Sequence, residues 1–397
     1  MKRRAALQRS RAALLAALSL ALLLAALGCA GGPTIRGWSG ATAGPTKALY
    51  VGSMDGRLYA LNPSARAQNQ PFPAEGEWVY PALDQPALRG PARSSGLGCA
   101  PSPSNVGIYG TPATVKSDNE TFVLFASDGG RVYAVSAASG QLRWQYPHES
   151  DLTIGPVIGS PVVVGDTLYV ASADASVYAL DTKTGDRKWR STTNGRIWTT
   201  PAVAGDAVYV GTFEGSGYAF SAKDGKQVWK ADVGAAVASV AASGTGVVLF
   251  GSFDNELRAY NSSNGALLWH FAGGNWFWSA PLIAGDAVYA TCLDGSLYSL
   301  NLKTGERLWS ADTKGPAAST PVLAGEQLVT VSQPGNLSVI RARDGVAVKT
   351  FTVGTEVLAP PFVSDSTVYV HGRDQRMYAV NIETGNTVWK QALTPGA

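Results

Sequence analysis

The side chains that most often bind metals or act as nucleophiles are scarce in this chain. Its 397 residues include three histidines, His148, His270 and His371, which lie far apart in the sequence. No acid, histidine and nucleophile stand in a recognisable catalytic pattern, and neither a GxxxxGKS/T phosphate loop nor an Asp-rich calcium loop occurs. We therefore predict no catalytic residues and no metal site.

Several aromatic residues and one arginine could instead form a binding surface. They occur in two segments, STTNGRIW (191–198) and FAGGNWFW (271–278). The candidates are Arg196, Trp198, Trp276, Phe277 and Trp278. Large flat apolar rings are common at the centre of binding surfaces. These residues predict a platform for a peptide edge or a planar ligand.

The two segments belong to a sequence repeat. Val208–Trp229 reads VYVGTFEGSGYAFSAKDGKQVW, and Val288–Trp309 reads VYATCLDGSLYSLNLKTGERLW. After a first interval of 45 residues, turn glycines recur every 40, at Gly140, Gly185, Gly225, Gly265, Gly305, Gly345 and Gly385. Four residues after a glycine stand Trp144, Trp189, Trp229, Trp269, Trp309 and Trp389, and Lys349 breaks this column. Such a period is typical of solenoids and propellers.

Each repeat predicts four short antiparallel strands. The segments TPAVA, VYVGTF, GYAFSA and QVWKAD are short and apolar or β-branched, and Gly-containing turns separate them. Eight such units run from DGRLYALN (55–62) to DQRMYAVN (374–381). The sequence therefore predicts an all-β, eight-bladed β-propeller of four-stranded antiparallel blades.

Residue types assign the inside and the outside of each blade. The first strand is small and apolar and should line a central channel, whereas the fourth carries charges that suit an exposed edge. We expect the six column tryptophans to pack in the core against the neighbouring blade. Trp198 and Trp278 then stand at the channel mouth, either as a binding platform or as a plug that merely fills the channel.

The N-terminus is typical of an export signal. Residues 1–28 combine five positive charges with the apolar run AALLAALSLALLLAALG, so we expect a signal peptide. Cys29 resembles the lipid acceptor of a bacterial lipobox, which predicts a lipid anchor, with simple secretion as the alternative. Cleavage would change the net charge from +3 to about −2, which argues against nucleic-acid binding.

The segment Ala173–Trp189, ADASVYALDTKTGDRKW, resembles the tryptophan-docking, PQQ-like repeat of quinoprotein-type eight-bladed propellers. Eight blades behind a lipobox-like cysteine resemble the BamB-like outer-membrane assembly lipoproteins. The resemblance implies residues 29–45 as a tether and 46–397 as the propeller. A Pro/Gly/Ser-rich insertion at about 81–110 extends the first crossover and marks either a binding side or decoration.

The resemblance implies a non-catalytic, exported scaffold in the periplasm or cell envelope. Its partner would be a protein of the barrel-insertion machinery, and the chain would be a monomer within a larger complex. The alternative is a periplasmic or cell-surface receptor for a glycan or a planar small molecule. A PQQ-dependent dehydrogenase is disfavoured, because the chain lacks the adjacent cysteines of that family, so neither PQQ nor calcium is expected. Pairing of Cys99 with Cys292 is left open.

Overall fold

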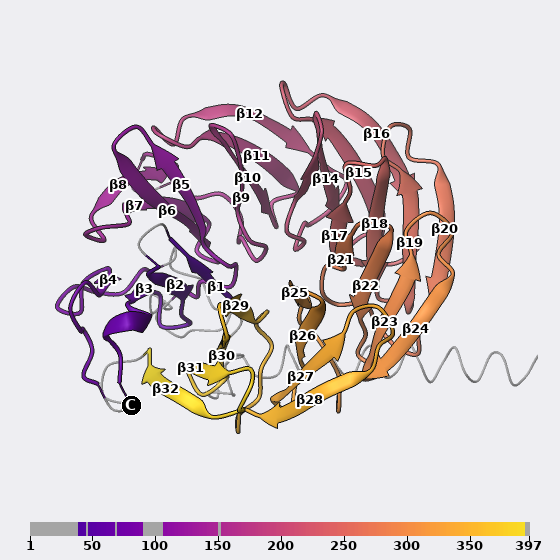
Figure 1. The fold of residues 1–397 in the computed structure, drawn as a ribbon. Coiled ribbons are helices and arrows are strands. Elements are labelled where there is room, and N and C mark those ends of the chain that lie inside the picture. The colour runs from indigo at the N-terminus through magenta and orange to yellow at the C-terminus, as the bar shows by residue number, and fades with distance from the viewer. Residues whose placement is uncertain (1–38, 45–46, 68–69, 90–105, 150–151, 394–397) are drawn as a thin grey trace, which may run out of the picture. The chain divides into compact units, whose positions relative to one another are not determined.

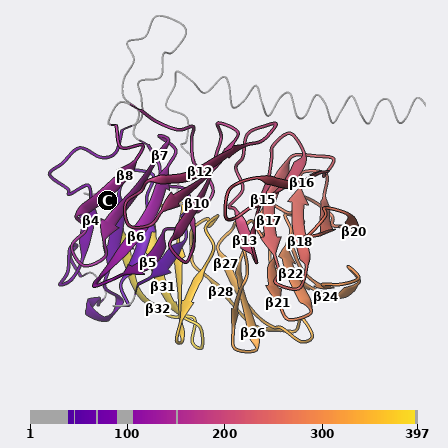
Figure 2. The same cartoon turned by 90° about the horizontal axis from the view of Figure 1, so that it is seen from above.

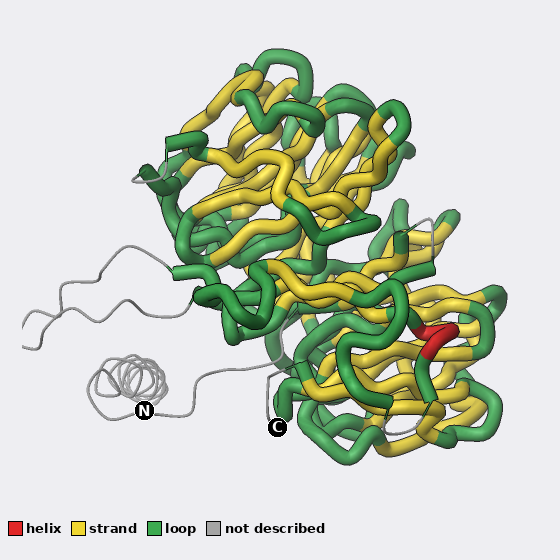
Figure 3. Tube along the Cα trace, turned by 90° about the vertical axis from the view of Figure 1, so that its left-hand side faces the viewer, coloured by secondary structure: helices red, strands yellow, loops and turns green. Residues whose placement is uncertain are grey.

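The computed structural model describes residues 39–44, 47–67, 70–89, 106–149 and 152–393. These residues form eight four-stranded antiparallel sheets and one short 3-10 helix, η1 (Pro63–Ala65). Strands and their connections account for nearly all of the described residues, which Figure 3 draws in colour. The predicted all-β, eight-bladed propeller is confirmed.

Blades 1 to 4 follow one another along the chain. Blade 1 contains β1 (Ala41–Ala43), β2 (Leu49–Gly52), β3 (Leu58–Leu61) and β4 (Trp78–Tyr80). Blade 2 contains β5 (Ala113–Ser117), β6 (Glu120–Ser127), β7 (Arg131–Ser136) and β8 (Leu142–Tyr146). Blade 3 contains β9 (Val162–Val164), β10 (Thr167–Ser172), β11 (Ser176–Asp181) and β12 (Arg187–Thr192). Blade 4 contains β13 (Ala202–Ala204), β14 (Ala207–Gly211), β15 (Ser216–Ser221) and β16 (Gln227–Asp232).

Blades 5 to 8 repeat the same order. Blade 5 contains β17 (Val237–Ala242), β18 (Val247–Ser252), β19 (Glu256–Asn261) and β20 (Leu267–Ala272). Blade 6 contains β21 (Leu282–Ala284), β22 (Ala287–Thr291), β23 (Ser296–Asn301) and β24 (Arg307–Asp312). Blade 7 contains β25 (Val322–Ala324), β26 (Gln327–Val331), β27 (Asn336–Arg341) and β28 (Ala347–Thr352). Blade 8 contains β29 (Phe362–Ser364), β30 (Thr367–His371), β31 (Arg376–Asn381) and β32 (Thr387–Ala392).

The blades stand in chain order around a ring, with their first strands inside and their fourth strands outside (Figure 1). First strands of neighbouring blades contact one another, as between β5 and β9 or β13 and β17. Figure 2 turns the same ring by 90°, so that neighbouring blades are seen side by side. Strand β1 lies inside the range 29–45 that the sequence assigned to a tether. The first blade therefore begins before residue 46. The sequence did not indicate this, because the short first strand carries no repeat motif.

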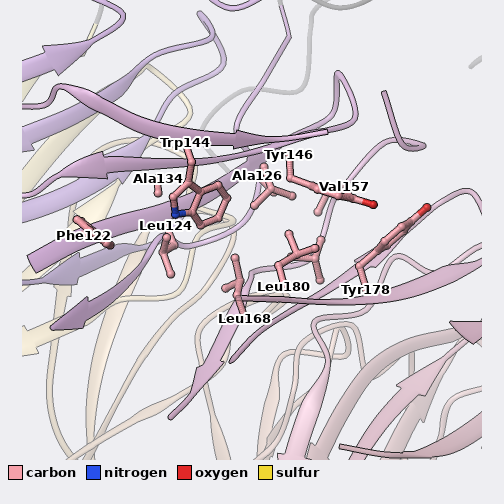
Figure 4. Close-up of a cluster of buried hydrophobic side chains, with 12 residues drawn as sticks. Phe122, Leu124, Ala126, Ala134, Trp144, Tyr146, Val157, Leu168, Tyr178 and Leu180 are labelled. Atoms are coloured by element: carbon pink, nitrogen blue, oxygen red, sulfur yellow. The ribbon is translucent and has the colours of Figure 1, made fainter. Parts of the chain in front are cut away.

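Hydrophobic side chains fill the spaces between blades. Side chains alternate along each strand, so one set faces the preceding blade and the other faces the following blade. Between blades 2 and 3, Leu124 and Trp144 pack with Leu168, Tyr178 and Leu180 (Figure 4). Every blade thus depends on both neighbours for the burial of its core.

The column tryptophans join each blade to the next. The Trp229 ring lies against Gly265, and its Nε1 donates a hydrogen bond to the Ser262 carbonyl at 2.8 Å. The same bond, to the residue 33 positions later, is made by Trp189, Trp269 and Trp309. Trp144, which precedes the longer first interval, donates to the equivalent carbonyl of Thr182, 38 positions later. Glycine is needed beneath the ring because its backbone has a positive φ and a Cβ would collide with the indole.

Two blades cover the equivalent glycine with rings outside the predicted column. In blade 1 Trp78 lies against Gly140 and donates to the Ala137 carbonyl at 3.0 Å. In blade 7, where Lys349 replaces the tryptophan, the Phe351 ring covers Gly385. The Lys349 ammonium donates to the Glu383 carbonyl at 2.5 Å. Ring and hydrogen-bond donor are thus supplied by two separate side chains.

The outer strand is interrupted at one repeat position in blades 2 to 8. The register shifts just before the docking position, which leaves one bulged residue without a cross-strand partner. The bulged residues are Arg143, Lys188, Val228, Leu268, Leu308, Val348 and Val388. A bulge disturbs the straight row of backbone groups that another strand would need. The outer edges are therefore protected by shape in addition to charge.

The ring closes between blade 8 and blade 1 without sharing a strand, because all four strands of each sheet are consecutive. Trp389 packs with Leu61 in a shared core cluster, and the buried Arg66 guanidinium lies 5.9 Å from the Trp389 ring centre. Ser53 donates to the Gln375 side-chain carbonyl at 2.9 Å. Packing and a few buried polar contacts therefore join the two ends of the array.

Candidate functional site

The crossover loops and the turns after the second strands meet on one face, here called the crossover face. The Phe213 amide, after β14, donates to the Arg196 carbonyl at 2.8 Å. Eighty residues on, the Leu293 amide donates to the Trp276 carbonyl at 3.0 Å. These repeated bonds fix each crossover segment in the same position relative to the second strand of its blade, so Trp198 and Trp278 occupy equivalent places.

An aromatic cluster spans blades 4 to 6 on this face. Its members are Trp198, Phe213, Phe253, Trp276 and Trp278. The ring centres of Trp198 and Phe213 are 4.8 Å apart, and those of Phe213 and Phe253 are 5.9 Å apart in an edge-on arrangement. Phe253 stacks on both Trp276, at 4.6 Å, and Trp278, at 5.5 Å. The rings support one another and form a preorganised surface.

The end of the aromatic cluster at Trp198 is open to solvent. Trp198 keeps 40% of its surface exposed, which is unusual for so large an apolar side chain. The exposed Arg196 guanidinium lies 5.2 Å from the Phe213 ring centre and 3.6 Å from a Glu214 carboxylate oxygen. An apolar ring beside a solvated ion pair can combine apolar contact with polar recognition.

Phe277 does not belong to the rim, so its assignment as a binding residue is wrong. It is 1% exposed and packs with Phe271 and Tyr298 in the core between blades 5 and 6. Along an extended segment successive side chains point to opposite sides, so Phe277 turns inward while Trp276 and Trp278 turn toward the crossover face.

Phe213 and Phe253 are central to the aromatic cluster, but they were not among the binding residues predicted from the sequence. They stand 40 residues apart, directly after the second strands of blades 4 and 5. The equivalent residues in other blades are Ala173, Leu293, Gln333 and Arg373. Two aromatics in successive blades at a position that is otherwise variable were the signal in the sequence.

The described ends of the 81–110 insertion lie on the same face. The Leu88 amide donates to the Gly56 carbonyl, and the Ile108 amide donates to that of Ser53, next to the turn after β2. Leu88 and Ile108 are buried. The rest of the insertion, including Cys99, lies outside the described residues, as do residues 1–28 and Cys29. Within the described ranges no helix is long and apolar enough to cross a membrane.

Metal-binding groups do not gather in the part of the chain that the structure describes. His148 pairs with Asp186 and His270 with Glu256 on the surface, whereas His371 is buried. Burial raises the pKa of the Cys292 thiol to about 11, and its Sγ donates to the Asn275 carbonyl. A buried thiol of this kind is a poor nucleophile at neutral pH.

The acidic residues of the Asp-Gly-type turns have structural partners. Tyr178, Tyr298 and Tyr378 each donate to the aspartate four residues earlier, at 2.5–2.6 Å. Burial, together with the Asp374 carboxylate, raises the pKa of Tyr378 to about 12. These carboxylates therefore fix turns on the crossover face, which accounts for their recurrence without a catalytic role.

Comparisons with known proteins agree with this architecture. The family model described as outer membrane protein assembly factor BamB matches residues 128–242, 214–353 and 317–397. Over 101 residues the chain is 36% identical to the serine/threonine-protein kinase AfsK of Streptomyces griseus. That match covers 25% of this chain and 12% of the kinase, so the chain spans a small part of that curated relative.

Two solved structures show the same fold. The crystal structure of BamB from Moraxella catarrhalis has a TM-score of 0.59 at 18% identity, covering 72% of this chain and 88% of that one. The computationally designed Ika8 protein has a TM-score of 0.64 at 14% identity, covering 86% and 95%. Since the family model matches more than half of the chain, and its repeats are the blades described above, the chain belongs to the BamB-like family of PQQ-repeat β-propellers.

Proposed function

We propose that this protein is a non-catalytic, exported scaffold that binds a protein partner through the aromatic cluster on its crossover face. The observation that carries the proposal is the open end of that cluster, where Trp198 is 40% exposed beside Arg196. The family supports a scaffold of the BamB type. The partner would belong to the outer-membrane barrel-assembly machinery, since the matching family is described as an outer membrane protein assembly factor.

Membrane attachment through an acylated Cys29 is part of the same proposal. Removal of residues 1–28 would leave Cys29 at the N-terminus, from which a lipid could hold the propeller at a membrane. Intact-mass measurement of the protein from its own membranes tests this step. A diacylated, N-acylated Cys29 is the expected result, and an unmodified mature chain would mean simple secretion.

Site-specific photocrosslinking tests the partner. A photoreactive phenylalanine analogue at position 198 of the full-length protein, irradiated in native membranes, should capture a barrel-assembly protein. The matched control carries the analogue at Lys303, an exposed residue of the turn that joins the third and fourth strands of blade 6, on the opposite face. Capture from position 198 alone supports the proposal. Equal capture from both positions, or no barrel-assembly protein from either, overturns it.

A receptor for a glycan or a planar small molecule is the second candidate. The exposed Trp198 ring favours it, because flat aromatic surfaces suit planar ligands. The match to a segment of a serine/threonine-protein kinase indicates that similar repeats also occur in a protein of a different kind. Mass spectrometry of the purified protein distinguishes the two, since a retained small molecule without a protein partner favours the receptor. A quinone-dependent enzyme is the least favoured function, and we propose no PQQ or calcium.

A further inference from the structure

At three repeat positions the interface between blades 6 and 7 has much smaller side chains than the interface before it. Between blades 5 and 6 the Tyr298 ring centre lies 5.0 Å from that of Phe271 and 6.1 Å from that of Phe277. Forty residues later the same repeat positions carry Ala311, Ala317 and Ser338. Three aromatic rings are thus replaced by two methyl groups and a hydroxymethyl group.

Three buried hydroxyl groups face this interface. Leu297 of blade 6 packs with Leu328 and Ile340 of blade 7 in one core cluster. Because side chains alternate along a strand, residues two positions away face the same side. Ser299 on β23, Thr330 on β26 and Ser338 on β27 therefore point into the same interface, and Thr330 and Ser338 are directly opposite each other across the sheet.

The three hydroxyls have no hydrogen-bond partner among the described residues. Each residue is at most 1% exposed. At the interface between blades 3 and 4 the equivalent residues are Ala179, Val210 and Tyr218, of which the first two bring no hydroxyl. A buried hydroxyl without a partner is costly, and three of them in one apolar interface call for a common partner.

We propose that Ser299, Thr330 and Ser338 form a buried site between blades 6 and 7 for a small neutral hydroxyl-bearing ligand, either ordered water or a short polyol. Each side-chain hydroxyl can both donate and accept, and so can each hydroxyl of such a ligand. The site carries no charged group among these residues, which selects against ions. Buried water typically makes about three hydrogen bonds to groups that would otherwise be unpaired.

The site lies below the crossover face. In blade 6 the Tyr298 hydroxyl reaches Asp294 in the turn after the second strand, at 2.6 Å. The equivalent residues in blade 7 are Ser338 and Pro334, and they cannot make this bond. Blade 7 therefore lacks the tyrosine ring that in blade 6 runs from this depth to the turn, and its own turn residue Pro334 is exposed.

A crystal structure from crystals grown without polyols tests whether the ligand is ordered water. Electron density within hydrogen-bond distance of at least two of the three hydroxyl oxygens supports the site. The polyol form is tested by saturation-transfer NMR with glycerol on the wild-type protein and on Ser299→Ala/Thr330→Val/Ser338→Tyr, which restores the side chains of other blades. A glycerol signal that disappears in this variant identifies a polyol as the ligand.

The outcomes separate the two ligands from no site at all. Bridging density without a glycerol difference means water. The proposal is overturned if the crystal structure shows no density at the site and the hydroxyls bond to one another or to the backbone, while the glycerol signal is the same in the wild type and the variant. If the triple variant does not fold, Ser338→Ala removes one hydroxyl without adding bulk, and it should lose the density or signal that depends on Ser338.

Discussion

The indole of Trp229 lies so close to Gly265 of the next blade that a Cβ on this glycine would come within 2.8 Å of the ring. The same side chain donates its Nε1 hydrogen to the Ser262 carbonyl. One residue therefore supplies both the apolar contact and the polar contact between blades 4 and 5. The repeated tryptophan and the repeated glycine are two halves of a single interaction.

Replacement of Trp229 by alanine should lower the free energy of unfolding by roughly 3–5 kcal/mol, because it removes a buried ring and leaves a cavity. Urea denaturation followed by circular dichroism measures this. Trp229→Phe is the matched control, since it keeps a ring and loses the hydrogen bond, and its loss should be smaller. An unchanged transition in Trp229→Ala would contradict the docking role.

Gly265→Ala should destabilise the protein more than Gly285→Ala does. Both glycines have a positive φ, at 72° and 59°, so both alanines bear a backbone cost of about 1 kcal/mol. Only Gly265 has a ring against it, whereas a Cβ at Gly285 would meet nothing within 4 Å. Displacing the indole should add about 1–3 kcal/mol. Equal melting temperatures for the two variants would show that the Trp229 indole can move aside without loss of stability.

Trp198→Ala combined with Trp278→Ala should weaken binding of the crosslinked partner by roughly tenfold or more, with the fold retained. Both rings lie outside the docking column and border the crossover face. Leu308→Ala is the control, because Leu308 is an exposed apolar residue on the outer strand of blade 6, 54% exposed. Titration calorimetry with the purified partner gives the affinities. Equal affinity of the double variant and the wild type would exclude the aromatic cluster as the binding surface.

Phe277→Ala should behave in the opposite way to the two tryptophan replacements beside it. Phe277 is buried against Phe271 and Tyr298, so its loss should cost roughly 3–5 kcal/mol of stability. Thermal melting of Phe277→Ala next to Trp276→Ala measures the difference. If Trp276→Ala proved the more destabilising of the two, the division between core and rim would be wrong.

Acid should weaken the closure of the ring through His371. Burial lowers the pKa of this imidazole to about 4, and its Nδ1 is 3.0 Å from the Ser39 carbonyl oxygen. An unfolded histidine takes up a proton near pH 6.5, so stability is complete above that pH and falls as the pH drops toward 4, by up to about 3 kcal/mol.

His371→Asn should reduce this pH dependence, since the amide can donate to Ser39 and does not titrate in this range. Denaturation curves between pH 7 and pH 4 measure the slope, with the exposed His270→Asn as the control. The same slope in His371→Asn and in the wild type would show that other groups cause the acid sensitivity.

The repeat determined most of the fold from the sequence alone. A 40-residue period of turn glycines, tryptophans and short apolar segments is compatible with few architectures, because each unit must bury its apolar faces against identical neighbours. The same period placed Trp198 and Trp278 at the crossover face. Exposure follows from repeat position when the backbone is the same in every blade.

The exceptions to the period could not be located in the same way. Trp78 and Phe351 occupy docking sites although they stand outside the column, because a ring can reach the same glycine from a different position in the chain. Phe277 looks like its neighbours in the sequence and differs from them in the direction of its side chain.

The sequence by itself determined how many blades there are, which strands are inner and outer, and where the common docking contacts lie. Only the tertiary structure decided how the ring closes at His371 and Gln375, which rings form the aromatic cluster, and which buried hydroxyls between blades 6 and 7 have no partner. The reason is physical, since periodicity reports the interactions that every blade shares. The particular function depends on contacts between different blades, and these are set by which side chains meet in space.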